Sequence, residues 1–216
     1  MLLHLAVYLF GNTFVILSYM EAKDTTKPHM IIMVGIPRSG KSFFAEHFAE
    51  TFKAPIISFD KLRKEIFTNP LYNDEEDKIL LKVSNYILDE VLKTKRTVIY
   101  EGRTSLQSDR ITISKTARKA GYEPLYIWVQ TELVSAKKRS LKSSLEKPAL
   151  SAEEFNNSLK HFSDPKIHEK AIVISGKHTY ASQLKIVLKH MIQTHPNDSQ
   201  QNTLVQPPKR RNYLIR

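Results

Sequence analysis

The strongest chemical signature in the sequence is a glycine-rich loop that follows an apolar run. It matches the pattern G-x-x-x-x-G-K-[ST] in full, through the residues Gly35, Ile36, Pro37, Arg38, Ser39, Gly40, Lys41 and Ser42. Glycine permits the close backbone approach that lets successive N–H groups point at phosphate oxygens, and the helix expected from Lys41 adds the positive end of its dipole. The pattern therefore predicts a nucleoside-triphosphate site, in which Lys41 bridges the β- and γ-phosphates and Ser42 binds Mg²⁺.

Motifs that would mark other classes of nucleotide-binding protein are missing from the sequence. An N-K-x-D motif, which reads guanine in GTP-dependent switch proteins, does not occur, so ATP is the expected nucleotide. The chain after the loop is too short for a helicase or a ring ATPase, and no apolar run ends in paired acids. These absences favour a small phosphotransferase that uses ATP and Mg²⁺ and holds a hydroxyl acceptor in a second pocket.

A carboxylate at the end of the second apolar run supplies a general base. Asp60 follows the run 55–58, and Arg63 lies three residues later, on the opening turn of the expected helix. This spacing places both side chains on one face beside the γ-phosphate, where Asp60 can accept the proton of an attacking hydroxyl and Arg63 can bind an anionic acceptor. The alternative is structural: Asp60 caps the helix and Arg63 is a surface side chain.

Short apolar runs alternate with helix-like stretches over residues 28–193, which is typical of a parallel α/β sheet. The expected strands are residues 30–34, 55–58, 97–100, 124–129 and 171–175. The expected helices are residues 41–51, 61–67, 74–93, 109–120, 132–142, 151–161 and 180–193. Five strands with intervening helices predict a P-loop NTPase fold, which is a doubly wound, mainly parallel sheet with helices on both faces and its ligand site at the carboxyl ends of the strands.

Three features together resemble the polynucleotide-kinase-like P-loop kinases, a family that includes the kinase domain of phage-type 5′-hydroxyl polynucleotide kinase. They are the glycine-rich loop, the pattern Asp60-x-x-Arg63 after the next strand, and a later strand that leads to an arginine-containing helix. The resemblance covers about residues 30–165. It implies that Asp60 is the general base and that Arg63 contacts a phosphate of the acceptor. Arg110 stands where that family has a further arginine, which assigns it to the acceptor site as well.

The third strand departs from the pattern of that family. Family members commonly end this strand with Asp, whereas this chain continues Glu101-Gly102-Arg103. Glu101 is one methylene longer than Asp and is expected to hold the water shell of Mg²⁺. Arg103 replaces a neutral amide, and it joins Arg63 and Arg110 in the predicted acceptor pocket. The alternative for Arg103 and Arg110 is solvated loop charge.

A basic stretch after the fourth strand predicts a helical lid. The segment Thr131-Glu132-Leu133-Val134, with the basic residues downstream, resembles the start of the lid in the polynucleotide kinases. Positive charge over the γ-phosphate accelerates phosphoryl transfer, so Arg139 is the expected lid residue, ahead of Lys138, which lacks the bidentate fork. With Lys41 and Asp60, Arg139 completes the predicted catalytic set. The alternative is that this helix presents an ordinary solvated basic face.

The ends of the chain differ in composition from the predicted kinase domain, residues 28–193. The chain has 216 residues, a formal net charge of +11 and no cysteine, which excludes a disulfide framework and thiolate metal sites. Residues 1–27 form an apolar leader, for which a membrane anchor, a packed element and a dispensable segment all stay open. The composition of residues 194–216 predicts a flexible basic tail. A cytoplasmic monomer is expected, with membrane attachment through residues 1–20 as the alternative.

Two functions are compatible with these assignments. The first is an ATP-dependent phosphotransferase, whose acceptor is either a polynucleotide 5′-hydroxyl or a small metabolite. The second is a nucleotide-gated P-loop ATPase with weak catalysis, which binds nucleic acid or a membrane through its basic helix and tail. Residues 137–147 and 209–216 carry eight of the eleven surplus positive charges. Since one of these clusters lies on the predicted lid, the charge favours a phosphate-handling enzyme over a dedicated nucleic-acid binder.

Overall fold

The central strand of the sheet is β1, which is buried along its whole length. In the computed structural model, which describes residues 27–142 and 149–193, five strands pair in parallel in the order β2-β3-β1-β4-β5. The strands are β1 (His29–Val34), β2 (Ile56–Ser58), β3 (Val98–Glu101), β4 (Glu123–Gln130) and β5 (Ile172–Ser175). The predicted α/β class and five-stranded sheet are confirmed, and the pairing is parallel throughout.

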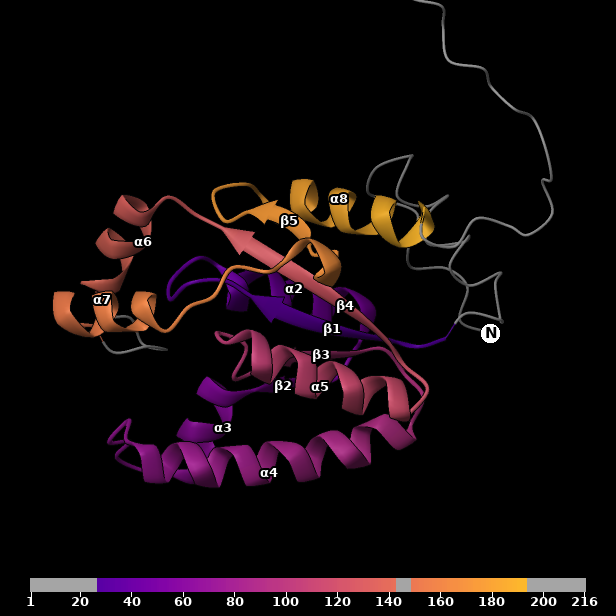
Figure 1. Cartoon of the computed structure of the whole chain (residues 1–216), viewed down its shortest axis with the longest axis horizontal. Helices are drawn as coiled ribbons and strands as arrows, with labels where there is room; N and C mark the ends of the chain where they lie inside the picture. Colours follow the sequence, from indigo (N-terminus) through magenta and orange to yellow (C-terminus); the bar gives the residue numbers. More distant parts are fainter. Residues whose placement is uncertain (1–26, 143–148, 194–216) are drawn as a thin grey trace, which may run out of the picture.

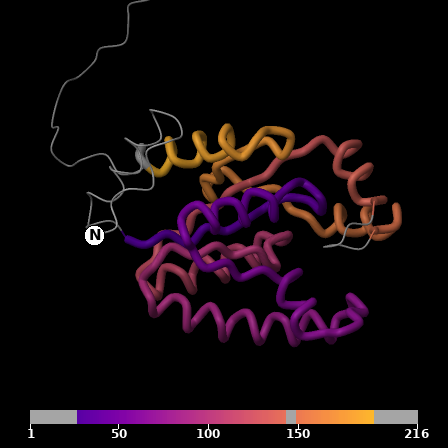
Figure 2. Tube along the Cα trace, turned by 180° about the vertical axis from the view of Figure 1, so that it is seen from behind, coloured from indigo at the N-terminus to yellow at the C-terminus, as the bar shows by residue number. Residues whose placement is uncertain are grey.

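Helices cover both faces of this sheet (Figure 1). They are α2 (Lys41–Phe52), α3 (Phe59–Ile66), α4 (Asp74–Lys93), α5 (Gln107–Lys119), α6 (Leu133–Ser140), α7 (Ala152–Lys160) and α8 (Tyr180–Gln193), with a short 3₁₀ turn η1 (Ile167–Glu169) before β5. α2 and α8 pack on one face, whereas α4 and α5 pack on the other. α6 and α7 stand together at the end of the molecule away from the start of β1, as seen from both sides in Figures 1 and 2.

Two apolar layers hold the sheet between these helices. Successive residues of a strand point to opposite faces. In β1, Ile31 and Met33 therefore join the layer under α2 and α8, and Met30, Ile32 and Val34 join the layer under α4 and α5. All five side chains are fully buried. Because both faces are covered, the strand has a continuous apolar run in the sequence instead of an alternating one.

Side chains cap the first turns of α4 and α7. Asn73 caps α4 by accepting the backbone N–H of Glu76 at 3.0 Å, and the first turn of α4 is acidic, as the helix dipole favours. α7 begins with a capping box. Ser151 accepts the backbone N–H of Glu154 at 3.1 Å, and the Glu154 carboxylate accepts the backbone N–H of Ser151 at 2.7 Å.

Some predicted segments lie outside the described residues. These are residues 1–26 of the apolar leader, residues 143–148 between α6 and α7, and the basic tail 194–216. The assignments of an anchor and of a tail function therefore stay predictions. Among the helices in the described ranges, none combines the length and the apolar composition that crossing a bilayer requires.

All five strands run in the same direction, so their carboxyl ends meet at one edge of the sheet. The residues that follow the strands at this edge are Gly35 after β1, Asp60 in the turn after β2, Gly102 after β3, Thr131 after β4 and Gly176 after β5. The glycine-rich loop and the predicted general base therefore belong to the same edge, which is where the candidate site lies.

Candidate functional site

The glycine-rich loop connects β1 to α2, as predicted. Its backbone has positive φ angles at Gly35 (150°), Arg38 (61°) and Gly40 (109°). A Cβ atom on Gly35 would lie 2.6 Å from the carbonyl oxygen of Val129, so a side chain does not fit there. Lys41 Nζ donates to the carbonyl oxygens of Gly35 and Ile36, both at 2.9 Å. The loop thus has the form of a phosphate cradle, with its lysine folded over it.

This loop is held from other strands by two residues whose contacts with it no sequence motif predicts. Thr131, directly after β4, donates its hydroxyl to the carbonyl oxygen of Ser39 at 2.8 Å. Gly176, directly after β5, packs so closely on the loop that a Cβ atom there would overlap the same carbonyl oxygen. The available signal for Gly176 is a glycine directly after a predicted strand, in a chain that has only six glycines.

Glu101, at the end of β3, reaches the start of α2. Its buried carboxylate accepts hydrogen bonds from the hydroxyls of Ser42 (2.5 Å) and Ser58 (3.2 Å). The structure thus brings together Ser42 and Glu101, the two residues assigned to Mg²⁺ from the sequence. Within the described ranges, no group of three or more His, Cys, Asp and Glu side chains gathers around a point. A cation here would therefore take its other ligands from phosphate and water.

Asp60 is the second residue of α3, and Ser58 occupies the cap position of this helix. The structural alternative, in which Asp60 caps the helix, is therefore wrong. Asp60 is exposed and lines a cavity of about 270 Å³. Arg38 and Lys41 of the glycine-rich loop, together with Glu101, line the same cavity. The predicted general base and the predicted phosphate-binding lysine thus face one space.

Arg63 does not line this cavity but turns towards α4. Its buried guanidinium donates to the carboxylates of Glu76 and Asp77 and lies over the ring of Tyr72, 4.8 Å from the ring centroid. The expectation that Asp60 and Arg63 point into the cleft together is therefore not met, and neither is the alternative of a surface side chain. Two acids on the first turn of α4 give the guanidinium closer partners than the cavity does.

Arg110 is a structural residue, which corrects its assignment to the acceptor pocket. Its side chain is 0% exposed, and Nε and Nη2 donate to the two carboxylate oxygens of Glu169 at 2.7 and 3.0 Å. Nη1 donates to the backbone carbonyl oxygens of Thr104, Ser105 and Ser163. A buried guanidinium whose donors are engaged in this way cannot reach a ligand, and it is not solvated loop charge either.

Arg103 is exposed and lies outside the lining of the cavity beside Asp60. Its Nε lies 3.7 Å from the Asp109 carboxylate, in a partly solvated ion pair. This geometry matches the loop-charge alternative and does not place Arg103 among acceptor-binding residues. The cavity lining instead includes Lys64 and Tyr72, which are exposed and belong to no sequence motif.

Arg139, the predicted lid residue, reaches the glycine-rich loop from α6. Its Nη1 donates to the carbonyl oxygen of Arg38 at 3.4 Å, and its Nη2 donates to the carbonyl oxygen of Gly176 at 3.3 Å. The residue is exposed, so its guanidinium is held beside the loop and still faces solvent. This is the position that the predicted role requires, while the role itself stays a prediction.

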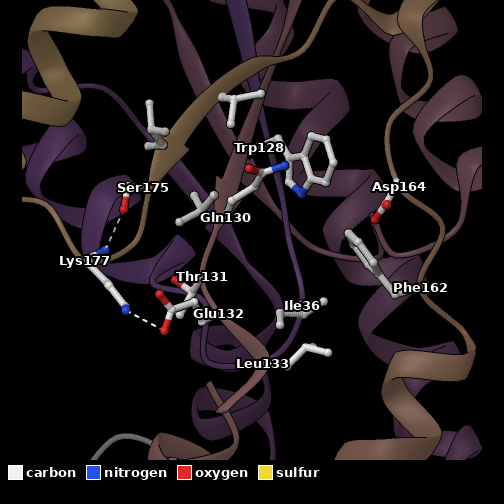
Figure 3. Close-up of a pocket in the computed structure, with 13 residues that line it drawn as sticks. Ile36, Trp128, Gln130, Thr131, Glu132, Leu133, Phe162, Asp164, Ser175 and Lys177 are labelled. Atoms are coloured by element: carbon white, nitrogen blue, oxygen red, sulfur yellow. Dashed lines mark hydrogen bonds and ion pairs between the residues drawn. The ribbon is translucent and has the colours of Figure 1, made fainter. Parts of the chain in front are cut away.

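A second cavity, of about 480 Å³, lies at the ends of β4 and β5 (Figure 3). Ile36 of the glycine-rich loop borders it, and Trp128 and Phe162 give it aromatic walls. Glu132 and Lys177 form an ion pair at 2.7 Å along its lining, and this pair holds the pKa of Glu132 below its usual range. Because β1 separates β2 and β3 from β4 and β5 in the sheet, this cavity and the cavity beside Asp60 lie on opposite sides of the loop.

Several solved structures share this fold. A candidate kinase from Chloroflexus aurantiacus has a TM-score of 0.62 at 16% identity, over 78% of this chain and 98% of its own. Kti12 from Chaetomium thermophilum, in complex with ADP-AlF3, has a TM-score of 0.58 at 16% identity, over 76% and 97%. A gluconokinase from Sinorhizobium meliloti has a TM-score of 0.56 at 17% identity, over 78% and 94%. These identities show a common P-loop kinase fold and nothing more specific.

The predicted likeness to P-loop kinases is therefore confirmed at the level of the fold, and the specificity of the phage-type enzyme stays a prediction. A comparison with curated protein sequences gives no significant match. Residues 29–216 match the family described as "Chromatin associated protein KTI12". This match begins at β1 and takes in the glycine-rich loop, Asp60, Glu101 and Arg139, and the chain therefore belongs to the KTI12 family.

Proposed function

We propose that the chain transfers the γ-phosphate of ATP to the hydroxyl group of an acceptor. The observation that carries this proposal is the pair of cavities on either side of the glycine-rich loop. A phosphotransferase has to hold a donor and an acceptor at once, whereas a hydrolase needs a single organic ligand. The larger cavity has aromatic walls that suit the nucleoside part of ATP, and the smaller cavity, beside Asp60, suits the acceptor.

The side chains around the loop supply the groups that an in-line transfer needs. Asp60 takes the proton of the acceptor hydroxyl as the hydroxyl oxygen bonds to the γ-phosphorus. The bond between this phosphorus and the β,γ-bridging oxygen breaks, and ADP leaves with the bonding electron pair. Lys41 and Arg139, both hydrogen-bonded to the backbone of the loop, neutralise the charge on the transferred group.

Ser42 and Glu101 fit a magnesium ion. They offer hydroxyl and carboxylate oxygens, the hard donors that Mg²⁺ prefers, and these oxygens meet at 2.5 Å at the start of α2. Ser42 would bind the ion, and Glu101 would hold its waters, because Mg²⁺ gives up its hydration shell reluctantly. The bound ion would supply charge neutralisation at the phosphate oxygens.

Glu101→Gln is expected to raise the Mg²⁺ concentration for half-maximal phosphotransfer about tenfold or more. The amide keeps the size of the side chain and one acceptor oxygen, but it loses the charge that orients the water shell of the cation. A Mg²⁺ titration at saturating ATP measures this effect, with Mg²⁺-free ATP binding as the control that should not change. An unaltered Mg²⁺ requirement would mean that Glu101 serves only as a hydrogen-bond acceptor for Ser42 and Ser58.

Asp60→Asn is expected to lower the kcat of phosphotransfer about a hundredfold and to leave ATP affinity unchanged, because the amide cannot take the proton. The assay follows label from γ-labelled ATP into a 5′-hydroxyl oligonucleotide and a panel of nucleosides and sugars. Asp89→Asn, which alters an exposed carboxylate on α4, is the matched control. Lys41→Ala shows how much label transfer remains when the glycine-rich loop lacks its lysine.

The same assay tests the alternative function, a nucleotide-dependent binding protein with weak catalysis. The phosphotransfer proposal falls if ATP is hydrolysed, no acceptor carries label, and Asp60→Asn hydrolyses ATP at the parent rate. Binding to nucleic acid and to anionic vesicles would then be measured at several salt concentrations, with and without residues 194–216.

A further inference from the structure

Tyr72 is an aromatic residue at the rim of the cavity beside Asp60, and its backbone has an unusual conformation. Its φ angle is +55°, in the left-handed region that residues other than glycine seldom adopt and that costs free energy. The residue lines the cavity and is nevertheless 51% exposed. The fold thus maintains a strained backbone that keeps an aromatic ring at the surface, which burial in the core does not explain.

A hydrogen-bonded network imposes this conformation. The Glu76 carboxylate accepts the backbone N–H groups of Leu71 at 2.6 Å and of Tyr72 at 2.9 Å. Arg63 donates to the same carboxylate and to that of Asp77. Burial would raise the pKa of Glu76, but the hydrogen bonds from Leu71, Arg63 and Tyr72 outweigh it and hold this pKa below its usual range. The carboxylate that fixes the loop is therefore charged at neutral pH.

The same network covers one face of the Tyr72 ring. The Arg63 guanidinium lies over this face, 4.8 Å from the centroid, in a cation–π contact. The exposed part of the ring therefore includes the opposite face. Phe59 and Leu150 add apolar side chains to the same cavity. An aromatic ring that is fixed from behind and open in front is a surface on which a second planar ring can stack.

We propose that the hydroxyl acceptor carries a planar ring of the nucleobase type, which stacks on Tyr72 while Asp60 faces the hydroxyl. This inference rests on the phosphotransfer function proposed above. Tyr72 is then a specificity-determining residue, and Arg63 and Glu76 are positioning residues that act through it. Arg63 thus serves the acceptor without contacting it, which accounts for its place outside the lining of the cavity.

Uridine and methyl β-ribofuranoside test the inference, because both present ribose hydroxyls and only uridine carries a planar ring. Binding is measured on the full chain by ligand-observed NMR, with saturating ADP to fill the donor side. The parent chain should bind uridine at least about tenfold more tightly, and Tyr72→Ala should remove about this factor. Tyr72→Phe should keep the preference. Tyr86→Ala, at a tyrosine on α4 that is 69% exposed, is the matched control and should change nothing.

Three results overturn the inference: equal binding of the two compounds by the parent chain, binding of neither, or a Tyr72→Ala chain that keeps the preference. ADP affinity, measured for each variant, reports that the fold is retained. Label transfer from γ-labelled ATP separates this inference from the proposed function. Uridine that binds through Tyr72 without becoming labelled supports the ring site and counts against phosphotransfer. If uridine becomes labelled but binds equally well to the parent chain and to Tyr72→Ala, the result supports phosphotransfer and overturns the stacking on Tyr72.

Discussion

Gly176→Ala is expected to weaken ATP binding about a hundredfold in a chain that still folds. The Cβ atom would overlap the carbonyl oxygen of Ser39 and the hydroxyl of Thr131, and it would lie 3.1 Å from the carbonyl carbon of Ser39. A backbone neighbour cannot rotate away, so the glycine-rich loop has to shift and lose its hydrogen bond from Thr131, now 2.8 Å long. A displacement of about 1 Å in a positioned group costs about a hundredfold in function. Titration with a fluorescent ATP analogue measures the loss.

Gly121→Ala is the matched control for this prediction. Gly121 has a positive φ angle, of 80°, and a Cβ atom there would meet only the end of the Lys95 side chain, at 3.6 Å. We therefore expect Gly121→Ala to lose about 1 kcal/mol of stability through backbone strain and to bind ATP normally. Thermal unfolding of both variants separates a loss of stability from a loss of ATP binding. A Gly176→Ala chain with parent ATP affinity would contradict the packing argument.

The strands and helices are predictable because burial on both faces of the sheet leaves apolar runs that local sequence shows. The start of α3 differs from the prediction, and its cap residue is engaged in a tertiary contact. α3 begins at Phe59, two residues before its expected start, with Ser58 at the cap position. The Ser58 hydroxyl bonds to Glu101, which is 43 residues away, and not to the helix. Serine is a preferred cap residue, but here its side chain makes a contact that only the fold shows.

The sequence predicts the candidate site in part. It predicts features that depend on local backbone better than the positions of long side chains, whose partners can be far away in sequence. The glycine-rich loop carries within its own motif the glycines that its backbone conformation requires, so the motif predicts its shape. Arginine is long, and its partner decides where it points. Arg63 meets acids 13 and 14 residues later, and Arg110 meets an acid 59 residues later. The sequence shows these positive charges, but only the fold shows which carboxylates neutralise them.

Three residues whose roles the sequence does not predict, Thr131, Gly176 and Tyr72, contact groups that other elements supply. Thr131 and Gly176 contact the backbone of the glycine-rich loop from β4 and β5. Tyr72 depends on α3 through Arg63 and on α4 through Glu76. The contacts of Thr131 and Gly176 require that the sheet order is known, because β4 and β5 are close to β1 in space and far from it in sequence. The contacts of Tyr72 are closer in sequence, but they require that the packing of α3 on α4 is known.

Arg110→Met is expected to lower the free energy of unfolding at pH 7 by about 3–5 kcal/mol, because it leaves the buried Glu169 carboxylate without its partner. The variant also deprives three backbone carbonyl oxygens of a donor. Urea unfolding measures the loss. Arg118→Met is the matched control on the same helix: Arg118 is exposed and makes one hydrogen bond, to Ser114, so about 1 kcal/mol or less is expected. A loss below about 1 kcal/mol for Arg110→Met would contradict the argument.

The Glu169 side of this pair predicts how stability changes with pH. Burial would raise the pKa of Glu169, but the hydrogen bonds from Arg110 and from the backbone N–H of Lys166 outweigh it and hold the folded pKa below the usual value. The charged carboxylate therefore adds stability above about pH 4.3, the ordinary pKa of Glu, and this contribution is lost as the pH falls through the folded pKa. Glu169→Gln should be less stable than the parent chain at pH 7, and the difference should narrow steadily towards low pH. A difference that is constant with pH would show that the lost charge is not what destabilises the variant.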